Sequence, residues 1–476
     1  MIIKDFKKIN DYLWEIPQSF QGGMRVPARV YATEKILLAS LDDRSMAQLL
    51  NVATLPGIYK YALAMPDIHE GYGFPIGGVA AMDAAEGVIS PGGIGYDINC
   101  GVRLLRSDLS ADVISSRIND LGDRIFAEVP SGTGRSGILK LSDKDLDLIL
   151  KRGARGITEK GFGGKEDLDF LESCGELPDA DPVMVSSRAK TRGQDQLGTM
   201  GAGNHFVEVG FVEKIFSKDA AEVFGLFLGQ VTVLIHTGSR GLGHQVATDY
   251  IRAMMTAMPK YGIQIPDREL ACAPFRSEEG QNYFKAMSAA ANFAWANRQL
   301  IAWEVRKAWK DVLGESGGDL KTVYDVAHNL AKIEKYDDKE LLVHRKGATR
   351  SFAKGNLEIP PRYRSVGQPV FIPGSMGTAS YVLAGADGAM KNTFGTTAHG
   401  AGRQMSRTEA RKSIEARALK EHMEAEGIRV FAGSLRGVAE EAPAAYKDID
   451  AVADVVAEAG IAEKVARLRP LAAIKG

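Results

Sequence analysis

Four of the eight histidines stand in sequence contexts where reactive sites are commonly assembled. His205 lies in GAGNHFVEVG and His399 in GTTAHGAGR, both beside glycine-rich loops, whereas His236 and His328 end the apolar runs VTVLIH and VYDVAH. Strand ends that lead into loops often carry active-site residues. A single histidine of this kind is usually a hydrogen-bonded structural residue, but four in similar contexts predict a shared site.

Asp97 and Cys100 add two further candidate ligands. They occur in PGGIGYDINCGVR, between a glycine turn and an apolar run. Asp, Cys and three His are the ligand types that hold transition metals, and a thiolate can bridge two ions because sulfur has more than one lone pair. A buried structural cysteine is the alternative, since the spacings match no zinc-finger or H-E-x-x-H pattern.

Arginines and glycines near two of the histidines indicate anion binding. Arg240 follows His236 in HTGSRG, and Arg403 follows His399 after Gly400-Ala401-Gly402. Glycine loops that enter a helix present backbone N–H groups to phosphate, and arginine adds a two-pronged donor. Two more basic clusters are either solvated surface or a track for a nucleic-acid backbone: Arg188, Lys190 and Arg192, and Arg345, Lys346 and Arg350.

The nucleotide-binding motifs of common nucleotidyl transferases are absent. The chain has no G-x-x-x-x-G-K-[ST] and no Lys-x-Asp-Gly nucleophile motif. A neutral imidazole can instead attack phosphorus and form a phosphoramidate. His399, between glycines and Arg403, is the candidate nucleophile.

The elements that must position these residues alternate irregularly. Apolar periodicity predicts helices over 282–313, over 406–426 after a Ser406-x-x-Glu409 capping pattern, and over 450–467. Short apolar runs predict strands at 206–212, 231–235 and 323–327. No steady strand–helix rhythm is present, so an α+β fold is expected rather than a Rossmann or TIM-barrel fold. The polar stretch at about 140–200 is interpreted as a surface insertion.

Composition excludes several classes of protein. The 476 residues include 59 Lys+Arg and 60 Asp+Glu, with 45% apolar residues, which excludes a mainly disordered chain and a uniformly basic nucleic-acid coat. Only three cysteines occur, which favours a reducing compartment over a disulfide framework. No apolar run reaches membrane-spanning length and the N-terminal residues do not resemble a signal peptide, so a cytoplasmic protein is expected.

Seven motifs, in order along the chain, resemble the RtcB family of RNA-splicing ligases. They are PDIHEGYGFPIGG (66–78), GGIGYDINCGVR (92–103), GAGNHFVEVG (201–210), HTGSRGLG (236–243), IPGSMGTASYVL (372–383), HGAGR (399–403) and EEAPAAYKDID (440–450). The resemblance runs from about residue 25 to Gly476. It implies a single large α+β catalytic domain over residues 1–476, with mixed sheets around a di-metal cleft.

The resemblance also implies an activity and a site. Members of this family join RNA 2′,3′-cyclic-phosphate or 3′-phosphate ends to 5′-hydroxyl ends, with GTP and two Mn²⁺ ions, through a histidine–GMP adduct and an RNA(3′)pp(5′)G end. His399 corresponds to the nucleophile, and Arg240 and Arg403 to phosphate clamps. The metal ligands correspond to Asp97, Cys100 as the bridge, His205, His236 and His328. The nucleotide site corresponds to Asn204 at the triphosphate, to Glu208, Ser375, Ser380, Tyr446 and Lys475 around the guanosine, and to the Gly400-Ala401-Gly402 loop. RNA with these ends, such as tRNA halves, is the implied partner, and archease is an implied activator.

Two other functions remain open from the residues. A metal-dependent phosphoesterase acting on RNA phosphate ends would use the same metal ligands but would need neither His399 nor Lys475. A non-catalytic RNA-binding module or peptide-release factor would need no metal ligands, and the complete Asp, Cys and His set argues against it.

Overall fold

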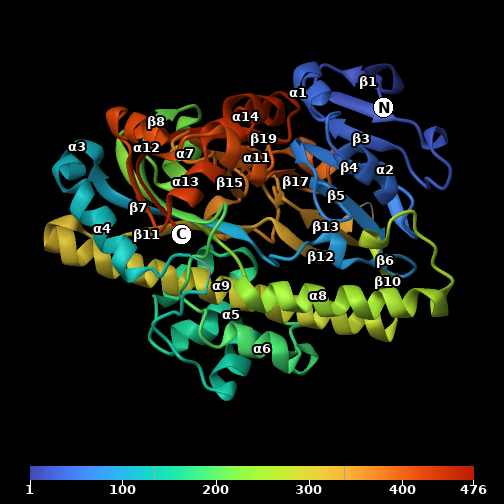
Figure 1. The fold of residues 1–476 in the computed structure, drawn as a ribbon, viewed down its shortest axis with the longest axis horizontal. Helices are drawn as coiled ribbons and strands as arrows, with labels where there is room; N and C mark the ends of the chain where they lie inside the picture. The colour runs from blue at the N-terminus through green and yellow to red at the C-terminus, as the bar shows by residue number, and fades with distance from the viewer. Residues whose placement is uncertain (133, 337) are drawn as a thin grey trace.

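The computed structural model describes residues 1–132, 134–336 and 338–476. Two large sheets and a layer of long helices form the body of the protein (Figure 1). The helices are α1 (Glu34–Ala39), α2 (Ser45–Val52), α3 (Ala111–Ile114), α4 (Ile118–Glu128), α5 (Asp143–Glu159), α6 (Ser187–Gly193), α7 (Lys218–Phe224), α8 (Arg240–Ala257), α9 (Glu278–Leu313), α10 (Asp387–Asn392), α11 (Arg407–Ser413), α12 (Ala416–Ala425), α13 (Leu435–Glu440) and α14 (Ile449–Glu458). The predicted α+β class is confirmed.

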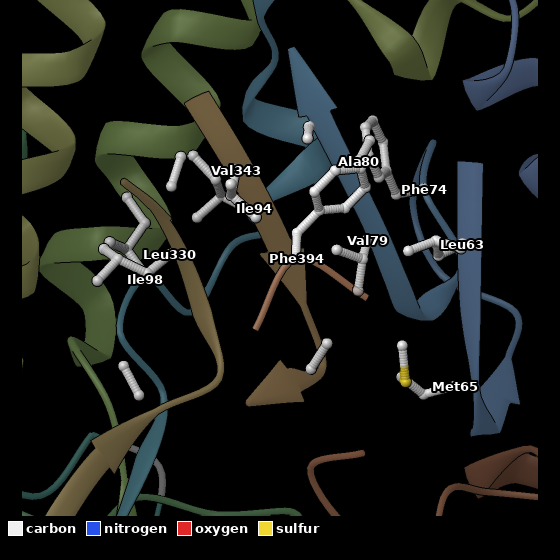
Figure 2. Packing of buried hydrophobic residues seen from close by; sticks show 14 of the residues in the cluster. Leu63, Met65, Phe74, Val79, Ala80, Ile94, Ile98, Leu330, Val343 and Phe394 are labelled. Carbon is white, nitrogen blue, oxygen red and sulfur yellow. The ribbon is translucent and has the colours of Figure 1, made fainter. Parts of the chain in front are cut away.

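The first sheet has seven strands. In spatial order they are β1 (Lys7–Asn10), β2 (Leu13–Ile16), β3 (Ala28–Tyr31), β4 (Ile58–His69), β5 (Ile76–Asp83), β13 (Lys339–Lys346) and β12 (Asn329–Tyr336). Neighbours are antiparallel except β3 and β4. Figure 2 shows Leu63, Val79 and Val343 from three of these strands packed around Phe74 and Phe394. This core supports β4, which carries the PDIHE motif.

The second sheet carries most of the candidate site. Its main path is β11 (Lys321–Ala327), β7 (Gly101–Ser110), β9 (Gln230–Thr237), β8 (Phe206–Ile215), β19 (Ala462–Lys475), β16 (Ser380–Gly385) and β15 (Pro369–Ile372), and β18 (Arg429–Ala432) pairs parallel to β19. The small pairs are β6 (Val88–Ile89) with β10 (Ala273–Pro274), and β14 (Ala348–Arg350) with β17 (Thr396–Ala398). Every residue of β9 is buried, as expected for a central strand covered on both faces.

Helix α9 packs against both the second sheet and the outer helices. Ser277 accepts a hydrogen bond from Gly280 N, and Gly314, with a φ of 61°, follows the last helical residue. The helix predicted over 282–313 is thus confirmed and begins four residues earlier. Its central turns are buried on all sides because α9 packs against β9 and also against α5 and α8, which lie beside it in Figure 1.

The 140–200 segment contains α5, α6 and short 3₁₀ turns between them. Helix α5 buries Leu146, Ile149, Leu150 and Ile157 against this layer, and its polar residues face outward. The high polarity of the sequence here therefore reflects the exposed face of an amphipathic helix.

The three predicted strands are confirmed within β8, β9 and β11, whereas two predicted helices differ. The 406–426 segment is two helices, because Ile414 is extended and the Glu415 side chain caps α12 by accepting from Ala418 N. The 450–467 prediction is wrong beyond Glu458. Gly460, with a φ of 68°, ends the helical region, and the chain continues as β19 between β8 and β16. Pairing with strands distant in sequence overrides the local periodicity. No described helix is long and apolar enough to span a membrane.

Candidate metal centre and nucleophile pocket

The ends of four adjacent strands bring the predicted metal ligands together. Cys100 precedes β7 and His205 precedes β8, while His236 lies near the end of β9 and His328 follows β11. The register pairs Gly101 with both Ala327 and Thr237, and Phe206 with His236. Because these strands are antiparallel neighbours, the start of one lies beside the end of the next, and all four side chains meet at one sheet edge.

Cys100, His236 and His328 form one group of potential ligands. The Cys100 Sγ atom lies 3.3 Å from His236 Nε2, which lies 3.3 Å from His328 Nε2. All three residues are buried. A cation between these donor atoms would be held by one sulfur and two imidazoles.

Asp97, Cys100 and His205 form a second group. The Asp97 Oδ2 atom lies 2.8 Å from His205 Nε2, and Cys100 Sγ lies 3.4 Å from the same nitrogen. His205 Nδ1 lies 3.0 Å from the Met200 carbonyl oxygen, which accepts its proton and leaves Nε2 as the ligand atom. The two groups share Cys100, so the residues fit two ions bridged by one thiolate.

The electrostatics of the cluster favour cation binding. Burial and the Asp97 carboxylate raise the pKa of the Cys100 thiol well above its ordinary value, so a thiolate there requires a cation. Burial lowers the pKa of His236 and of His328 well below the ordinary imidazole value. Both rings are therefore neutral, which is the state that binds metal.

A cavity of about 300 Å³ opens beside the cluster. Most of the sequence-predicted residues line it, namely Asp97, Cys100, Asn204, His236, His328, Ser375, His399, Gly400, Ala401, Gly402, Arg403, Tyr446 and Lys475. Residues from position 69 to position 475 thus converge on one space. Motifs that are far apart in the sequence therefore contribute to the same pocket.

His399 is oriented by Asp67, a residue that the sequence analysis did not identify. The His399 Nδ1 atom lies 2.6 Å from Asp67 Oδ2, which also accepts from the backbone N–H of His399 at 2.9 Å. Asp67 is fully buried on β4. Because Asp67 engages Nδ1, Nε2 is the ring nitrogen that remains for chemistry. The only signal in the sequence was the position of Asp67 inside the PDIHEGYGFPIGG motif.

The glycine loop after His399 packs tightly on β4. Gly402 has a φ of 72°, and a Cβ atom there would lie 2.2 Å from the Asp67 carbonyl oxygen. The Gly400 N–H donates to Asp67 Oδ2 and the Ala401 N–H donates to Pro373 O. These two amides, expected from the sequence to face phosphate, thus make contacts within the protein, and the loop serves to fix His399.

Arg403, Glu441 and Tyr446 form a polar wall of the cavity. Arg403 Nη1 donates to Tyr446 Oη at 2.9 Å and to Glu441 Oε1 at 3.3 Å, and the Tyr446 hydroxyl donates to Glu441. Burial alone would raise the pKa of Glu441, but Lys475, Tyr446 and Arg403 hold that pKa below its ordinary value. Glu441 was not singled out from the sequence, although it lies in the EEAPAAYKDID motif.

Lys475, next to the C-terminal residue, is buried at the end of β19. Its Nζ atom donates to Gly203 O at 3.0 Å and lies 3.4 Å from Glu441 Oε2. Pairing of β19 with β8 places Lys475 opposite Phe206, which also lines the cavity. The terminal lysine is therefore a fixed part of the pocket rather than a frayed end.

Four predicted residues are not among those that line the cavity. His205 is in the metal cluster, and Ser380 Oγ accepts from Gly374 N, which supports the loop that carries Ser375. Glu208 is buried two residues along β8 from Phe206, and such residues share a strand face. Arg240, which begins α8, donates from Nε to Thr199 Oγ1 and lies near Asp97.

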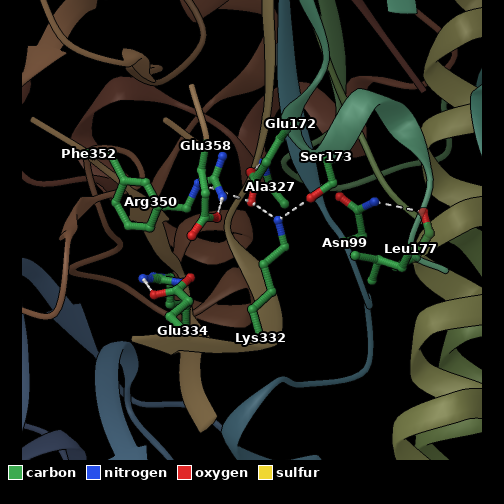
Figure 3. A network of polar contacts seen from close by, with 12 residues as sticks. Asn99, Glu172, Ser173, Leu177, Ala327, Lys332, Glu334, Arg350, Phe352 and Glu358 are labelled. Carbon is green, nitrogen blue, oxygen red and sulfur yellow. Dashed lines mark hydrogen bonds and ion pairs between the residues drawn. The ribbon is translucent and has the colours of Figure 1, made fainter. Parts of the chain in front are cut away.

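The basic cluster at 345–350 is neither solvated surface nor a nucleic-acid track. Arg345 is buried in a two-pronged ion pair with Glu334. Arg350 lies between Glu172 and Glu358 (Figure 3), and its Nε atom also donates to Gln368 Oε1. The ion pairs neutralise these buried charges, so the cluster is part of the interior.

Lys346 is the exception in that cluster. It lines the cavity, and its Nζ atom donates to the Tyr72 and Phe74 carbonyl oxygens. In the 188–192 cluster, Arg188 and Arg192 are exposed and Lys190 pairs with Asp147.

Comparison with known proteins identifies the family of the chain. The family model described as "tRNA-splicing ligase RtcB" matches residues 48–476. The chain is 55% identical to the tRNA-splicing ligase RtcB of Thermococcus kodakarensis over 99% of this chain and 98% of that protein. It is 54% identical to the protein of the same name from Archaeoglobus fulgidus, over the same shares of both chains. The chain belongs to the RtcB family.

Proposed function

We propose that this protein is a GTP- and Mn²⁺-dependent RNA ligase that joins 2′,3′-cyclic-phosphate or 3′-phosphate ends to 5′-hydroxyl ends. The names of the relatives and the donor set of the cavity support the proposal. We further propose that residues 1–476 act as one catalytic domain, since the cavity draws residues from both large sheets.

The observation that carries the proposal is the contact between Asp67 and His399 beside the metal ligands. With its Nδ1–H donated to a buried carboxylate, the imidazole has a nucleophilic lone pair on Nε2. The His399 and His328 ring centroids lie 4.9 Å apart, so the nucleophile stands next to the metal cluster. A phosphoesterase would use the metal cluster but would not need His399, a further histidine held in a fixed orientation.

The residues fit a pair of divalent cations. Asp97, Cys100 and His205 would hold one ion, and Cys100, His236 and His328 the other. When bound, such ions neutralise phosphate charge and help to align an in-line displacement. The thiolate must stay reduced to act as a ligand, which supports our placing this activity in the cytoplasm.

In the first proposed step, His399 Nε2 attacks the α-phosphorus of GTP. A nitrogen–phosphorus bond forms, the bond to the β-phosphate bridging oxygen breaks, and pyrophosphate leaves. Asp67 stabilises the imidazolium character that develops on His399 during the attack. Arg240 and Arg403 would stabilise the negative charge on the phosphate oxygens.

Two transfers complete the reaction. An oxygen of the RNA 3′-phosphate attacks the GMP phosphorus, and the bond to His399 breaks to regenerate the neutral imidazole. The 5′-hydroxyl of the second RNA then attacks the 3′-phosphate phosphorus, loses its proton and expels GMP. A cyclic phosphate is first opened by water to the 3′-phosphate.

Guanosine is proposed to bind in the part of the cavity lined by Ser375, Tyr446 and Lys475. Asn204 would contact the triphosphate, and Ser375, Ser380, Glu208, Tyr446 and Lys475 would form the guanosine pocket. Ser375, Tyr446 and Lys475 line the cavity, Ser380 supports the loop that carries Ser375, and the buried Glu208 lies close to Lys475. Buried polar groups of this kind favour a base that supplies complementary donors and acceptors.

A joining assay tests this function directly. Two short RNAs, one ending in a 2′,3′-cyclic phosphate and a labelled one beginning with a 5′-hydroxyl, are incubated with protein, Mn²⁺, GTP and archease. A joined product that requires GTP is expected. His399→Ala should abolish joining, whereas His422→Ala, at an exposed position on α12, should not. Opening of the cyclic phosphate without joining, in both variants alike, would instead establish a phosphoesterase.

A further inference from the structure

Helix α9 approaches the metal cluster from behind with two adjacent polar side chains. Asn297 and Arg298 are both fully buried on this helix, although neither lines the cavity. Burying an amide and a guanidinium is costly unless their hydrogen bonds are made. The partners that they bind lie on or beside the segments that carry the proposed metal ligands.

Arg298 uses all five of its N–H groups on three such segments. Nη1 donates to Asn99 O at 2.7 Å and to Thr237 O at 2.9 Å. Nη2 donates to Asn99 Oδ1 and to Asp325 Oδ1, both at 2.9 Å, and Nε donates to Asp325. A guanidinium has five donors in a fixed plane, so none is left over.

The positions of these acceptors relate directly to one ligand group. Asn99 immediately precedes Cys100, Thr237 immediately follows His236, and Asp325 lies on β11, the strand that leads into His328. One planar group therefore fixes the relative positions of all three residues in the Cys100, His236 and His328 group.

Gly101 makes this approach possible. A Cβ atom at Gly101 would lie 3.0 Å from Arg298 Nη2 and 2.5 Å from Val326 O. The residue after Cys100 therefore has to lack a side chain for the guanidinium to reach both neighbouring strands. Asn99 is also held by α9 itself, because its Nδ2 donates to Ala291 O at 2.7 Å.

Asn297 binds segments next to the other ligand group. Its Oδ1 accepts from Gly198 N at 2.8 Å and from Thr199 N at 3.1 Å. Its Nδ2 donates to Thr199 O and to Gly238 O, both at 3.1 Å. The next residue after Thr199, Met200, carries the carbonyl that contacts His205 Nδ1.

The segment after Gly238 reaches the remaining ligand of that group. Ser239 N donates to Asp97 Oδ1 at 3.0 Å, so the loop that Asn297 binds at Gly238 also holds the Asp97 carboxylate. His205 and Asp97 are thus both supported from segments that Asn297 fixes.

We propose that Asn297 and Arg298 are positioning residues that set the spacing of the two ligand groups, and hence the affinity of the metal pair. The inference rests on the proposed metal pair. Groups that orient metal ligands typically contribute 10–100-fold to metal affinity. Lysine cannot replace Arg298, because a single ammonium on a flexible stem cannot span three segments in one plane.

Arg103 provides a matched control. It is also fully buried, and its Nε donates to the same carboxylate, Asp325 Oδ2, at 2.8 Å. Its Nη1 atom donates to Gln299 Oε1 on α9, and its Nη2 atom has no hydrogen-bond partner among the described residues, so Arg103 holds neither Asn99 nor Thr237. Arg103→Lys thus disturbs the same buried ion-pair network without releasing the loops at Cys100 and His236.

The test is a Co²⁺ titration of metal-free protein, without GTP or RNA. Thiolate-to-cobalt charge-transfer absorption reports ligation by Cys100, equilibrium dialysis counts the ions, and thermal melting monitors the fold. Arg298→Lys is expected to weaken Co²⁺ binding 10–100-fold. Arg103→Lys is expected to lower the melting temperature while keeping Co²⁺ affinity within about threefold of wild type. Equal losses of affinity in the two variants, or unchanged affinity in Arg298→Lys, would overturn the proposal.

Asn297→Asp is the second variant, and it tests the positioning role if Arg298→Lys does not fold. It keeps the size and the acceptors of Asn297 but removes both N–H donors. The expected result is weakened binding of the ion held by Asp97, Cys100 and His205, and two ions bound at wild-type affinity would contradict the proposal. If wild-type protein gives no thiolate-to-cobalt absorption, the proposed metal pair itself is refuted. This result is distinct from a failure of the positioning role, which would leave the wild-type absorption intact.

Discussion

The Oδ2 atom of Asp67 lies 2.6 Å from the Nδ1 atom of His399 and also accepts from the His399 backbone N–H at 2.9 Å. The two residues are 332 positions apart in the chain, and the β4 strand and the loop after β17 bring them together. A buried carboxylate in this position fixes both the tautomer and the orientation of the imidazole.

Asp67→Asn should therefore slow the formation of the covalent GMP adduct by about 10²–10⁴-fold, because the amide no longer requires the Nδ1–H tautomer. The rate is measured by single-turnover labelling with radioactive GTP. Asp11→Asn, in an exposed ion pair with Lys8, serves as the control. A rate close to wild type in Asp67→Asn would show that the contact is only structural.

Cys100→Ser should reduce the metal content of the protein. Cys100 belongs to both ligand groups, so its loss affects both ions, and a neutral hydroxyl bridges cations poorly. Elemental analysis after dialysis against Mn²⁺ should show two ions per wild-type chain and fewer than one in the variant. Cys174→Ser, at an exposed cysteine, should retain both ions. Full occupancy in Cys100→Ser would contradict the shared-ligand arrangement.

GTP affinity should depend on pH through Glu208. Burial raises the pKa of this carboxyl to about 8, with Lys475 opposing the shift, so below pH 8 the group is protonated in the free protein. Guanine N–H donors bind the carboxylate form, which requires the proton to leave. Affinity should thus fall up to about tenfold for each pH unit below 8. Glu208→Gln should bind GTP more weakly, and its GTP affinity should no longer show this decrease with falling pH. Parallel calorimetric profiles for the two proteins between pH 6.5 and 8.5 would exclude the role.

Glu304 should make the protein less stable as the pH rises. Its carboxyl is buried on α9, neither oxygen accepts a hydrogen bond from the described residues, and burial raises its pKa to about 9. Between its unfolded pKa and pH 9, the folded state holds a proton that the unfolded state has lost, so stability decreases with increasing pH.

Glu304→Gln should remove that dependence. We expect its melting temperature to exceed that of wild type by about 2–5 °C at pH 8.5 and to match wild type near pH 4.5. Differential scanning calorimetry across this range measures the difference. A constant offset at every pH would mean that Glu304 does not change its protonation on unfolding.

The candidate metal ligands could be predicted from the sequence because their chemistry is visible in the residue types. Cysteine, aspartate and histidines at strand ends are recognisable wherever they occur in the chain. Asp67 could not be identified in this way, since a carboxylate acquires its role only when β4 packs against the His399 loop. The role of Arg298 could not be predicted for the same reason, because its partners are distant in the chain. The periodicity of its helix indicates only that one face is buried.

The errors have a common physical origin. The segment after Glu458 has a periodic apolar pattern, but strand pairing with β8 and β16 determines its conformation. The arginines at 345 and 350 look like surface charges in the sequence, and only the distant Glu334 and Glu172 allow them to be buried. Both features depend on partners far away in the chain, which local patterns do not encode.

The most direct test of the proposed histidine mechanism is the intact mass of the purified protein after incubation with GTP and Mn²⁺, with His399→Ala alongside. A gain equal to one GMP, labile in acid and absent from the variant, is expected, because the proposed mechanism passes through a phosphoramidate at His399. An unchanged mass, with both ions confirmed in the protein and archease supplied, would contradict the histidine mechanism.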